Sequence, residues 1–170
     1  MSTAVHPVLR LINRCDTLAQ TFDTHFSASC TLLSNLAAGT PAAGSPTTMD
    51  DTLMSLRSTL ASCEEVVGQM LACIYEDIPH LLDQLDREGA GQGGPGVVGN
   101  WNPRLALDGI SQLFYSYQDL LTEKRELLAD FTCEEIGPKE FVDGWTSVGG
   151  DLKEQRKQQV DDLADLLAAF

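Results

Sequence analysis

The chain has 170 residues, of which 43% are hydrophobic; this suffices for one domain with a continuous core and is too little for two. Its formal net charge is −14, and the whole excess of acid lies between residues 48 and 170. A surface this acidic repels phosphate backbones, so we expect no direct contact with nucleic acid. The acidity favours either solubility or the docking of a basic partner. No stretch approaches about 18 uninterrupted apolar residues, so we expect no membrane span.

Apolar residues recur at alternating steps of three and four along the chain, which is the period of helices that pack side by side. The first helix is expected over about 7–38, because Pro7 is a favourable first-turn residue. A flexible linker rich in glycine and proline follows at 39–47. The second helix is expected over about 49–86, with a kink or break at Pro79, which has no backbone N–H.

The second half of the chain repeats this organisation. A glycine-rich flexible linker at 88–100 lacks the preceding strand and the Lys-Ser/Thr ending of a phosphate-binding loop. A third helix is expected at 103–131, a short helical piece at 138–145, and a last helix at 151–169. No convincing strand appears. The sequence therefore predicts a single all-α domain over 1–170, an elongated antiparallel helical bundle or coiled coil of three long helices plus a C-terminal helix.

The residue types that build catalytic and metal sites are scattered. The three histidines are far apart, and no Cys-x-x-Cys, His-Glu-x-x-His or Gly-x-Ser-x-Gly motif is present. The clustered carboxylates lack the glycine-containing loop of an EF-hand and fit a solvated helix face better. We therefore expect no enzymatic activity, no cofactor and no bound metal.

Cysteine usage indicates the compartment. The five cysteines are odd in number, and without a disulfide framework or a signal peptide they indicate a reducing intracellular environment. Cys15 and Cys63 fall on apolar stripes, where a free thiol behaves as a small buried hydrophobe.

Several unusual residues mark a candidate partner surface. Trp101 stands at the edge of the glycine-rich linker and Trp145 precedes a double glycine. Each tryptophan either closes an end of the bundle or is an exposed anchor for a partner. Lys124 interrupts the apolar stripe of the third helix; either its stem packs while its head reaches water, or it fixes register or contacts a partner. We therefore expect partner binding by Trp101, Tyr117, Lys124, Arg125 and Trp145.

Taken in order, these residues resemble the C-terminal signature of the cyclin-dependent kinase 2-interacting protein family. In that family a tryptophan precedes a helix with a Tyr-x-x-Glu-Leu-x-x-Lys-like core, and a second tryptophan follows a short loop. Here residues 117–124 read Tyr-Gln-Asp-Leu-Leu-Thr-Glu-Lys, with Asp119 near the position of the acid. Upstream, residues 11–12 and 16–18 resemble the family's first helix, and residues 53–70 occupy the place of its middle coiled coil.

The chain departs from the family pattern at two places. Cys15 stands where an aromatic residue is expected, and Trp145 is followed by Thr-Ser-Val-Gly-Gly instead of a proline-containing segment. The contacts that this segment makes in the family are therefore not carried over.

The resemblance implies a small, non-enzymatic nuclear adaptor that links cell-cycle kinases, DNA replication and checkpoint factors of the DNA damage response. It also implies an assembly with AAA+ ATPases that acts in ribosome maturation and in the turnover of chromatin-associated proteins. Its partners would be other proteins in a hetero-oligomer. The alternative is a coiled-coil subunit of another nuclear assembly of the kinetochore, Mediator or tethering type, because such subunits share long heptads and acidic surfaces.

Overall fold

The structure is a computed structural model that describes residues 6–37, 49–89 and 103–169, and within these ranges it contains helices and no strand. The elements are α1 (Pro7–Ala37), α2 (Met49–Ala72), the π-helical turn η1 (Cys73–Asp77), α3 (Ile78–Gly89), α4 (Pro103–Thr132), α5 (Pro138–Thr146) and α6 (Gly150–Ala169). The prediction of an all-α fold is confirmed.

Two kinds of local signal explain where the helices begin. Pro7, Pro103 and Pro138 each occupy the first residue of a helix, where the missing N–H of proline costs no hydrogen bond. Acidic residues in the first turn of α2 favour its start, because the N-terminal end of a helix dipole is positive. The linker predicted at 39–47 lies outside the described residues. The linker predicted from residue 88 begins too early, because α3 continues to Gly89, and the rest of it lies outside the described residues.

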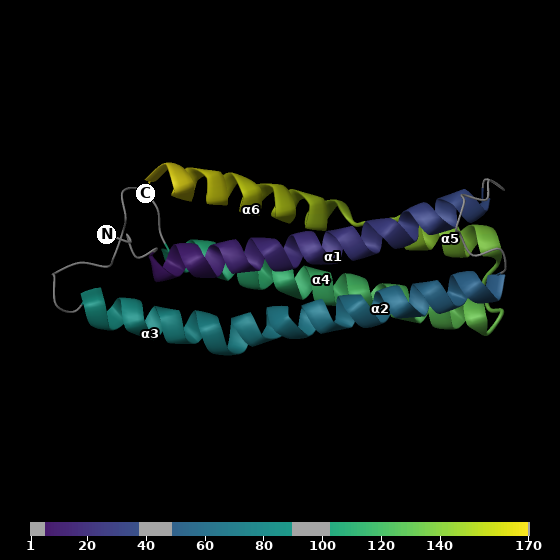
Figure 1. Cartoon of the computed structure of the whole chain (residues 1–170), viewed down its shortest axis with the longest axis horizontal. Helices are drawn as coiled ribbons and strands as arrows, with labels where there is room; N and C mark the ends of the chain where they lie inside the picture. Colours follow the sequence, from purple (N-terminus) through teal and green to yellow (C-terminus); the bar gives the residue numbers. More distant parts are fainter. Residues whose placement is uncertain (1–5, 38–48, 90–102, 170) are drawn as a thin grey trace.

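Figure 1 shows α1, the α2–η1–α3 rod and α4 side by side in alternating directions, with α6 running back along the molecule. Helix α6 packs against α1 and α4, and the short α5 packs against the same two helices at one end. Helix α1 begins and α6 ends at the opposite end of the elongated molecule (Figure 1). The arrangement is that of a helical bundle in which sequential helices are antiparallel neighbours.

The turn η1 is the one irregularity within the rod. The Ile78 N–H donates to the carbonyl of Cys73, five residues back, which widens this turn. A kink or break was expected at Pro79, which is only the second residue of α3. The structure corrects this expectation: the irregularity precedes the proline, as one wide turn, and the helix continues past it.

The core consists of the apolar stripes of α1, α2 and α4, which bury side chains along their full length. Fully buried examples are Val8, Cys15, Phe22, Leu56, Met70, Leu107 and Phe114. Cys15 and Cys63 are buried as predicted, and burial raises the pKa of the Cys63 thiol to about 11. Such burial of apolar surface is the main favourable term in folding.

Helix α6 docks differently from the others. Among its described side chains only Gln159 is buried, and only Leu152 and Leu163 pack partly against the core. Apolar contacts therefore contribute little to the docking of α6 on the bundle, and polar contacts must stabilise its position.

Candidate functional site

Lys124 was predicted to lie on a partner surface, but the structure places it in the interior, where it is 1% exposed. Its Nζ donates to the carbonyl oxygens of Gly144 and Ser147, both at 2.7 Å, and lies 3.1 Å from the Glu123 carboxylate. The Phe26 ring centroid is 5.9 Å from the same nitrogen. The two carbonyls belong to the C-terminal end of α5, where a cation is favoured by the helix dipole. Lys124 thus caps α5, and of the alternatives that the sequence left open, the one in which its head reaches water is wrong.

Trp145 closes the same end of the bundle and is fully buried. Its ring stacks on Phe26 and is tilted against Phe141, with centroid distances of 6.1 and 5.7 Å. Its Nε1 donates to the Ser29 hydroxyl at 2.9 Å, and that hydroxyl donates to the Phe26 carbonyl. Of the two roles that the sequence allowed, the structure therefore shows closure of the bundle end. The other tryptophan, Trp101, lies outside the described residues.

Tyr117 belongs to a polar network that fastens α6 to α1 and α4. Its buried hydroxyl donates to Asp23 at 2.8 Å. Arg156 of α6 pairs with the same carboxylate at 3.4 Å and with Asp16 at 2.8 Å. The Arg156 guanidinium also donates to the side-chain oxygen of Gln159 at 2.8 Å. These partly buried, charge-assisted contacts connect α6 to the rest of the fold in place of an apolar stripe.

We expect the fold to lose stability in alkali because of Tyr117. Burial, and then the charge of Asp23, raise the pKa of this hydroxyl above its usual value of 10. The unfolded chain therefore releases this proton near pH 10 while the folded chain retains it. Stability should then fall by about 1.4 kcal/mol per pH unit above that point for this one group.

Tyr117→Phe should remove this contribution to the fall of the unfolding free energy with pH above pH 10. Urea denaturation at several pH values between neutrality and strong alkali measures that dependence for both proteins. The difference between the two proteins at pH 7 gives the separate cost of losing the hydrogen bond to Asp23. Parallel stability curves above pH 10 would show that Tyr117 ionises equally in both states.

Arg125 is the only described member of the predicted surface that is accessible from solvent. The other three described members are interior, and their polar atoms form hydrogen bonds within the chain: Tyr117, Lys124 and Trp145. Arg125 belongs to a row of three exposed side-chain pairs between α4 and the α2–η1–α3 rod, which we call the outer face: Arg104–Asp86, Tyr115–Tyr75 and Arg125–Glu64. Along each helix, successive members of the row lie about three helical turns apart. Their numbers rise along α4 and fall along the rod, because the two run antiparallel.

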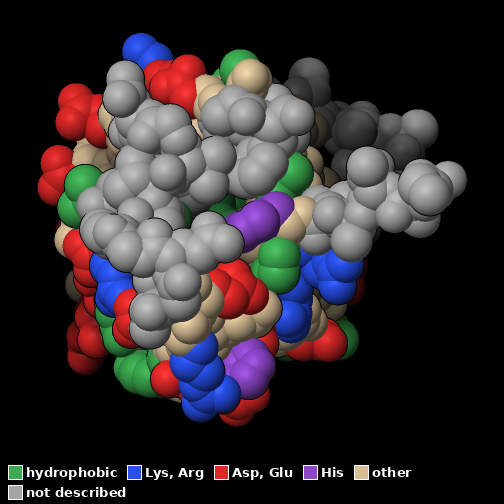
Figure 2. Space-filling view, turned by 90° about the vertical axis from the view of Figure 1, so that its left-hand side faces the viewer, with side chains coloured by type: hydrophobic (Ala, Val, Ile, Leu, Met, Phe, Trp, Pro, Cys, Tyr) green, Lys and Arg blue, Asp and Glu red, His purple; other side chains and the backbone are tan. Residues whose placement is uncertain are grey.

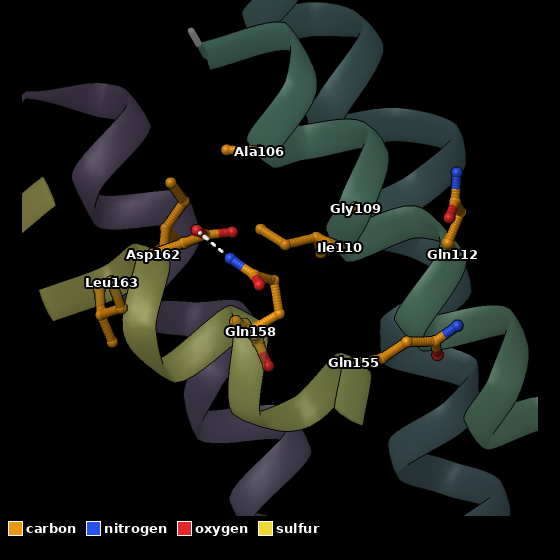
Figure 3. A pocket seen from close by; sticks show the side chains of 10 residues that line it. Ala106, Gly109, Ile110, Gln112, Gln155, Gln158, Asp162 and Leu163 are labelled. Carbon is orange, nitrogen blue, oxygen red and sulfur yellow. Dashed lines mark hydrogen bonds between the residues drawn. The ribbon is translucent and has the colours of Figure 1, made fainter. Parts of the chain in front are cut away.

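A pocket of about 160 Å³ lies between α1, α4 and α6. Aliphatic side chains from all three helices line it: Ile12, Ala106, Ile110 and Leu163. Figure 3 shows Gln158 and Asp162 of α6 hydrogen-bonded to each other beside it, with Ile110 of α4 opposite. Gln159 also lines the pocket; it is 6% exposed, and its Nε2 has no hydrogen-bond partner among the described residues. An unpaired buried donor costs about 1–3 kcal/mol.

Apart from Tyr117, the residues of the network that holds α6 were not among those predicted from the sequence. Arg156 meets Asp16 and Asp23 across more than 130 residues of chain, a pairing that no local spacing reveals. One signal was available: the two aspartates lie seven residues apart in the first helix and therefore share one of its faces.

Three comparisons with known proteins bear on identity. No protein-family model, no curated protein and no solved structure matches this chain. Among the described residues, no three His, Cys, Asp or Glu side chains are placed to hold a metal ion. None of the described helices is both long and apolar enough to cross a membrane.

Proposed function

We propose that this protein is a non-enzymatic helical adaptor that binds a partner protein through its outer face. The observation behind the proposal is the pair Tyr75 and Tyr115, which lie exposed side by side in the middle of that face, with their hydroxyl oxygens 3.0 Å apart. Tyr75 is 65% exposed. Tyrosine is enriched at protein–protein interfaces and among the residues that dominate their binding energy.

The charge around the tyrosines favours a basic partner. The three arginines of α3 and α4 each pair with an acid of this chain: Arg87 with Asp83, Arg104 with Asp86 and Arg125 with Glu64. Exposed acids near the two tyrosines add negative charge: Glu76 follows Tyr75 in η1, and Asp119 lies four residues after Tyr115 on α4. At the end of the molecule in Figure 2, by contrast, acidic and basic side chains are interspersed. A basic segment is therefore complementary to the outer face.

For the identity of the assembly we propose what the family resemblance implies: a nuclear complex of cell-cycle kinases, replication and checkpoint factors, and AAA+ ATPases of ribosome maturation. We also propose that the long helices pack as a coiled coil. Support for the assembly comes from the sequence resemblance. Three of its residues also bridge pairs of helices within this chain, namely Tyr117, Lys124 and Trp145. The alternative remains a subunit of a kinetochore, Mediator or tethering assembly.

Replacing both Tyr75 and Tyr115 with alanine should remove the bound partner and leave the fold intact. Truncating two exposed aromatic rings leaves no core cavity, but loss of interface hot spots weakens binding by roughly tenfold or more. The measurement is affinity purification of the tagged full chain from nuclear extract, with partners identified by mass spectrometry, beside a melting curve.

Met54→Ala is the matched control, because Met54 is 67% exposed on α2 but roughly 30 Å along the rod from Tyr75. Capture of replication factors or AAA+ ATPase subunits by the unmodified chain, lost only in the tyrosine variant, supports the proposal. Kinetochore or Mediator subunits would favour the alternative. A tyrosine variant that melts normally and keeps every partner would show that the outer face is merely solvated.

A further inference from the structure

We propose that the pocket between α1, α4 and α6 is an anchor site for a tyrosine side chain of a partner protein. The origin of the tyrosine in a partner rests on the proposed adaptor function, whereas the chemistry of the site follows from the residues that line it. The pocket is separate from the outer face, because none of the six residues of that face lines it.

The size of the pocket limits the occupant to one ring. A volume of about 160 Å³ is close to that of an apolar cavity that takes up benzene. Sites for cofactors and drug-sized ligands are larger, on the order of 300–1,000 Å³. The aliphatic walls supplied by Ile12, Ile110 and Leu163 require that the body of the occupant be apolar.

The amide of Gln159 adds a polar requirement. Its oxygen accepts a hydrogen bond from Arg156 at 2.8 Å, which fixes the orientation of the amide and leaves Nε2 as the free end. Because Gln159 is 94% removed from solvent, the free N–H needs an acceptor inside the pocket. The occupant must therefore end in a hydrogen-bond acceptor.

Tyrosine alone among the usual anchor side chains meets both requirements. Tryptophan and arginine are donors only and cannot pair with an N–H, and leucine and phenylalanine have no acceptor. An acidic side chain would lie near Asp162, which lines the same pocket. A phenol oxygen can accept from Gln159, and its O–H can donate to a carboxylate such as Asp162.

The tyrosine must come from outside this chain. The sequence contains three tyrosines, all on η1 or α4, and none of them lines the pocket. Tyr117 is buried against Asp23, and Tyr75 and Tyr115 contact each other on the outer face.

The test uses two probes that differ by one hydroxyl: p-cresol, the analogue of the tyrosine side chain, and toluene. Each is titrated into the isotope-labelled full chain and followed by NMR at the backbone amides of Gly109, Gln112 and Gln155. We expect p-cresol to shift these signals with an affinity at least about tenfold higher than that of toluene, because only p-cresol satisfies the Gln159 amide.

Two variants locate the probe, and glycine supplies a matched control. A Cβ built on Gly109 meets no atom within 4 Å, so Gly109→Leu projects a side chain at the pocket without forcing the backbone apart. Gly68 on α2 is equally unobstructed and does not line the pocket, so Gly68→Leu is the control. Both variants should melt at or above the normal temperature, because leucine favours a helix more than glycine does. Only Gly109→Leu should weaken p-cresol binding, by tenfold or more.

Gln159→Met keeps the length of the side chain and removes the donor, so p-cresol and toluene should then bind equally. The proposal is overturned if the unmodified chain already binds the two probes equally, or if Gly109→Leu leaves p-cresol binding unchanged.

The partner experiment separates this proposal from the adaptor function. Loss of a captured partner in Gly109→Leu, with retention in Gly68→Leu, supports the anchor site. Retention in both variants, with loss in the outer-face variant, leaves the adaptor function standing and overturns the anchor site. A dimer of this chain that both Tyr75→Ala and Gly109→Leu dissociate would assign the tyrosine to a second copy and overturn the assignment to a different protein.

Discussion

Lys124→Glu should lower the free energy of unfolding by about 3–5 kcal/mol, the usual cost of leaving a buried charge without a partner. The new carboxylate would stand where Nζ now donates to the carbonyls of Gly144 and Ser147. It would have no donor there and would face the negative end of the α5 dipole. Because small domains are stable by only about 5–15 kcal/mol, this substitution removes a large share of the total.

Arg125→Glu is the matched control, one residue further along α4 but exposed and paired only with Glu64. Loss of one surface ion pair should cost about 1 kcal/mol or less. Urea denaturation followed by circular dichroism measures both variants. Equal stability of the two would contradict the role of Lys124 as an interior cap and restore the expectation of a solvated helix face.

Trp145→Ala should cost about 3–5 kcal/mol, because it removes the largest side chain of the closed end and leaves a cavity. The cavity would open between Phe26 and Phe141, both of which lie in ring contact with the indole. The Ser29 hydroxyl would lose its donor as well. Chemical denaturation of the full chain, monitored by circular dichroism, gives the value.

Trp145→Phe separates the two contributions. It retains much of the ring contact and loses only the Nε1 donor and part of the volume, so a smaller cost of about 1–2 kcal/mol is expected. If alanine were no more disruptive than phenylalanine, the indole would contribute little packing, and the end of the bundle would depend on α5 in some other way.

The sequence was a good guide to features that depend on local spacing. The start at Pro7 follows from the preference of proline for the first turn, and the apolar stripes and the burial of Cys15 and Cys63 follow from helical periodicity; both are properties of near neighbours. The role of Lys124 was harder to predict, because a lysine in a stripe is compatible with a packed stem and a solvated head. What decides its position is α5, a separate element that supplies two carbonyls about twenty residues further along the chain.

The candidate sites could not be predicted from the sequence for the same reason. Tyr75 reaches Tyr115 only because α4 lies antiparallel to the rod, and the pocket exists only because α6 folds back over Ile12 and Ile110. Neither arrangement leaves a motif in the sequence. A polar last helix was the visible hint that its docking would not resemble that of the others.

The wide turn η1 also keeps the apolar sides of α2 and α3 in phase with each other. Cys73 and Ile78 are consecutive buried positions of the rod and lie five residues apart, whereas a regular α-helix repeats its buried side every three or four residues. The next buried position, Leu81, follows at the normal spacing of three. An extra residue in an α-helix turns everything beyond it by about 100°. Here the π-helical turn absorbs that rotation within 73–77, so the apolar side of α3 stays aligned with that of α2. The one residue beyond the α-helical phase is thereby confined to a single turn, and buried positions continue on both sides of it.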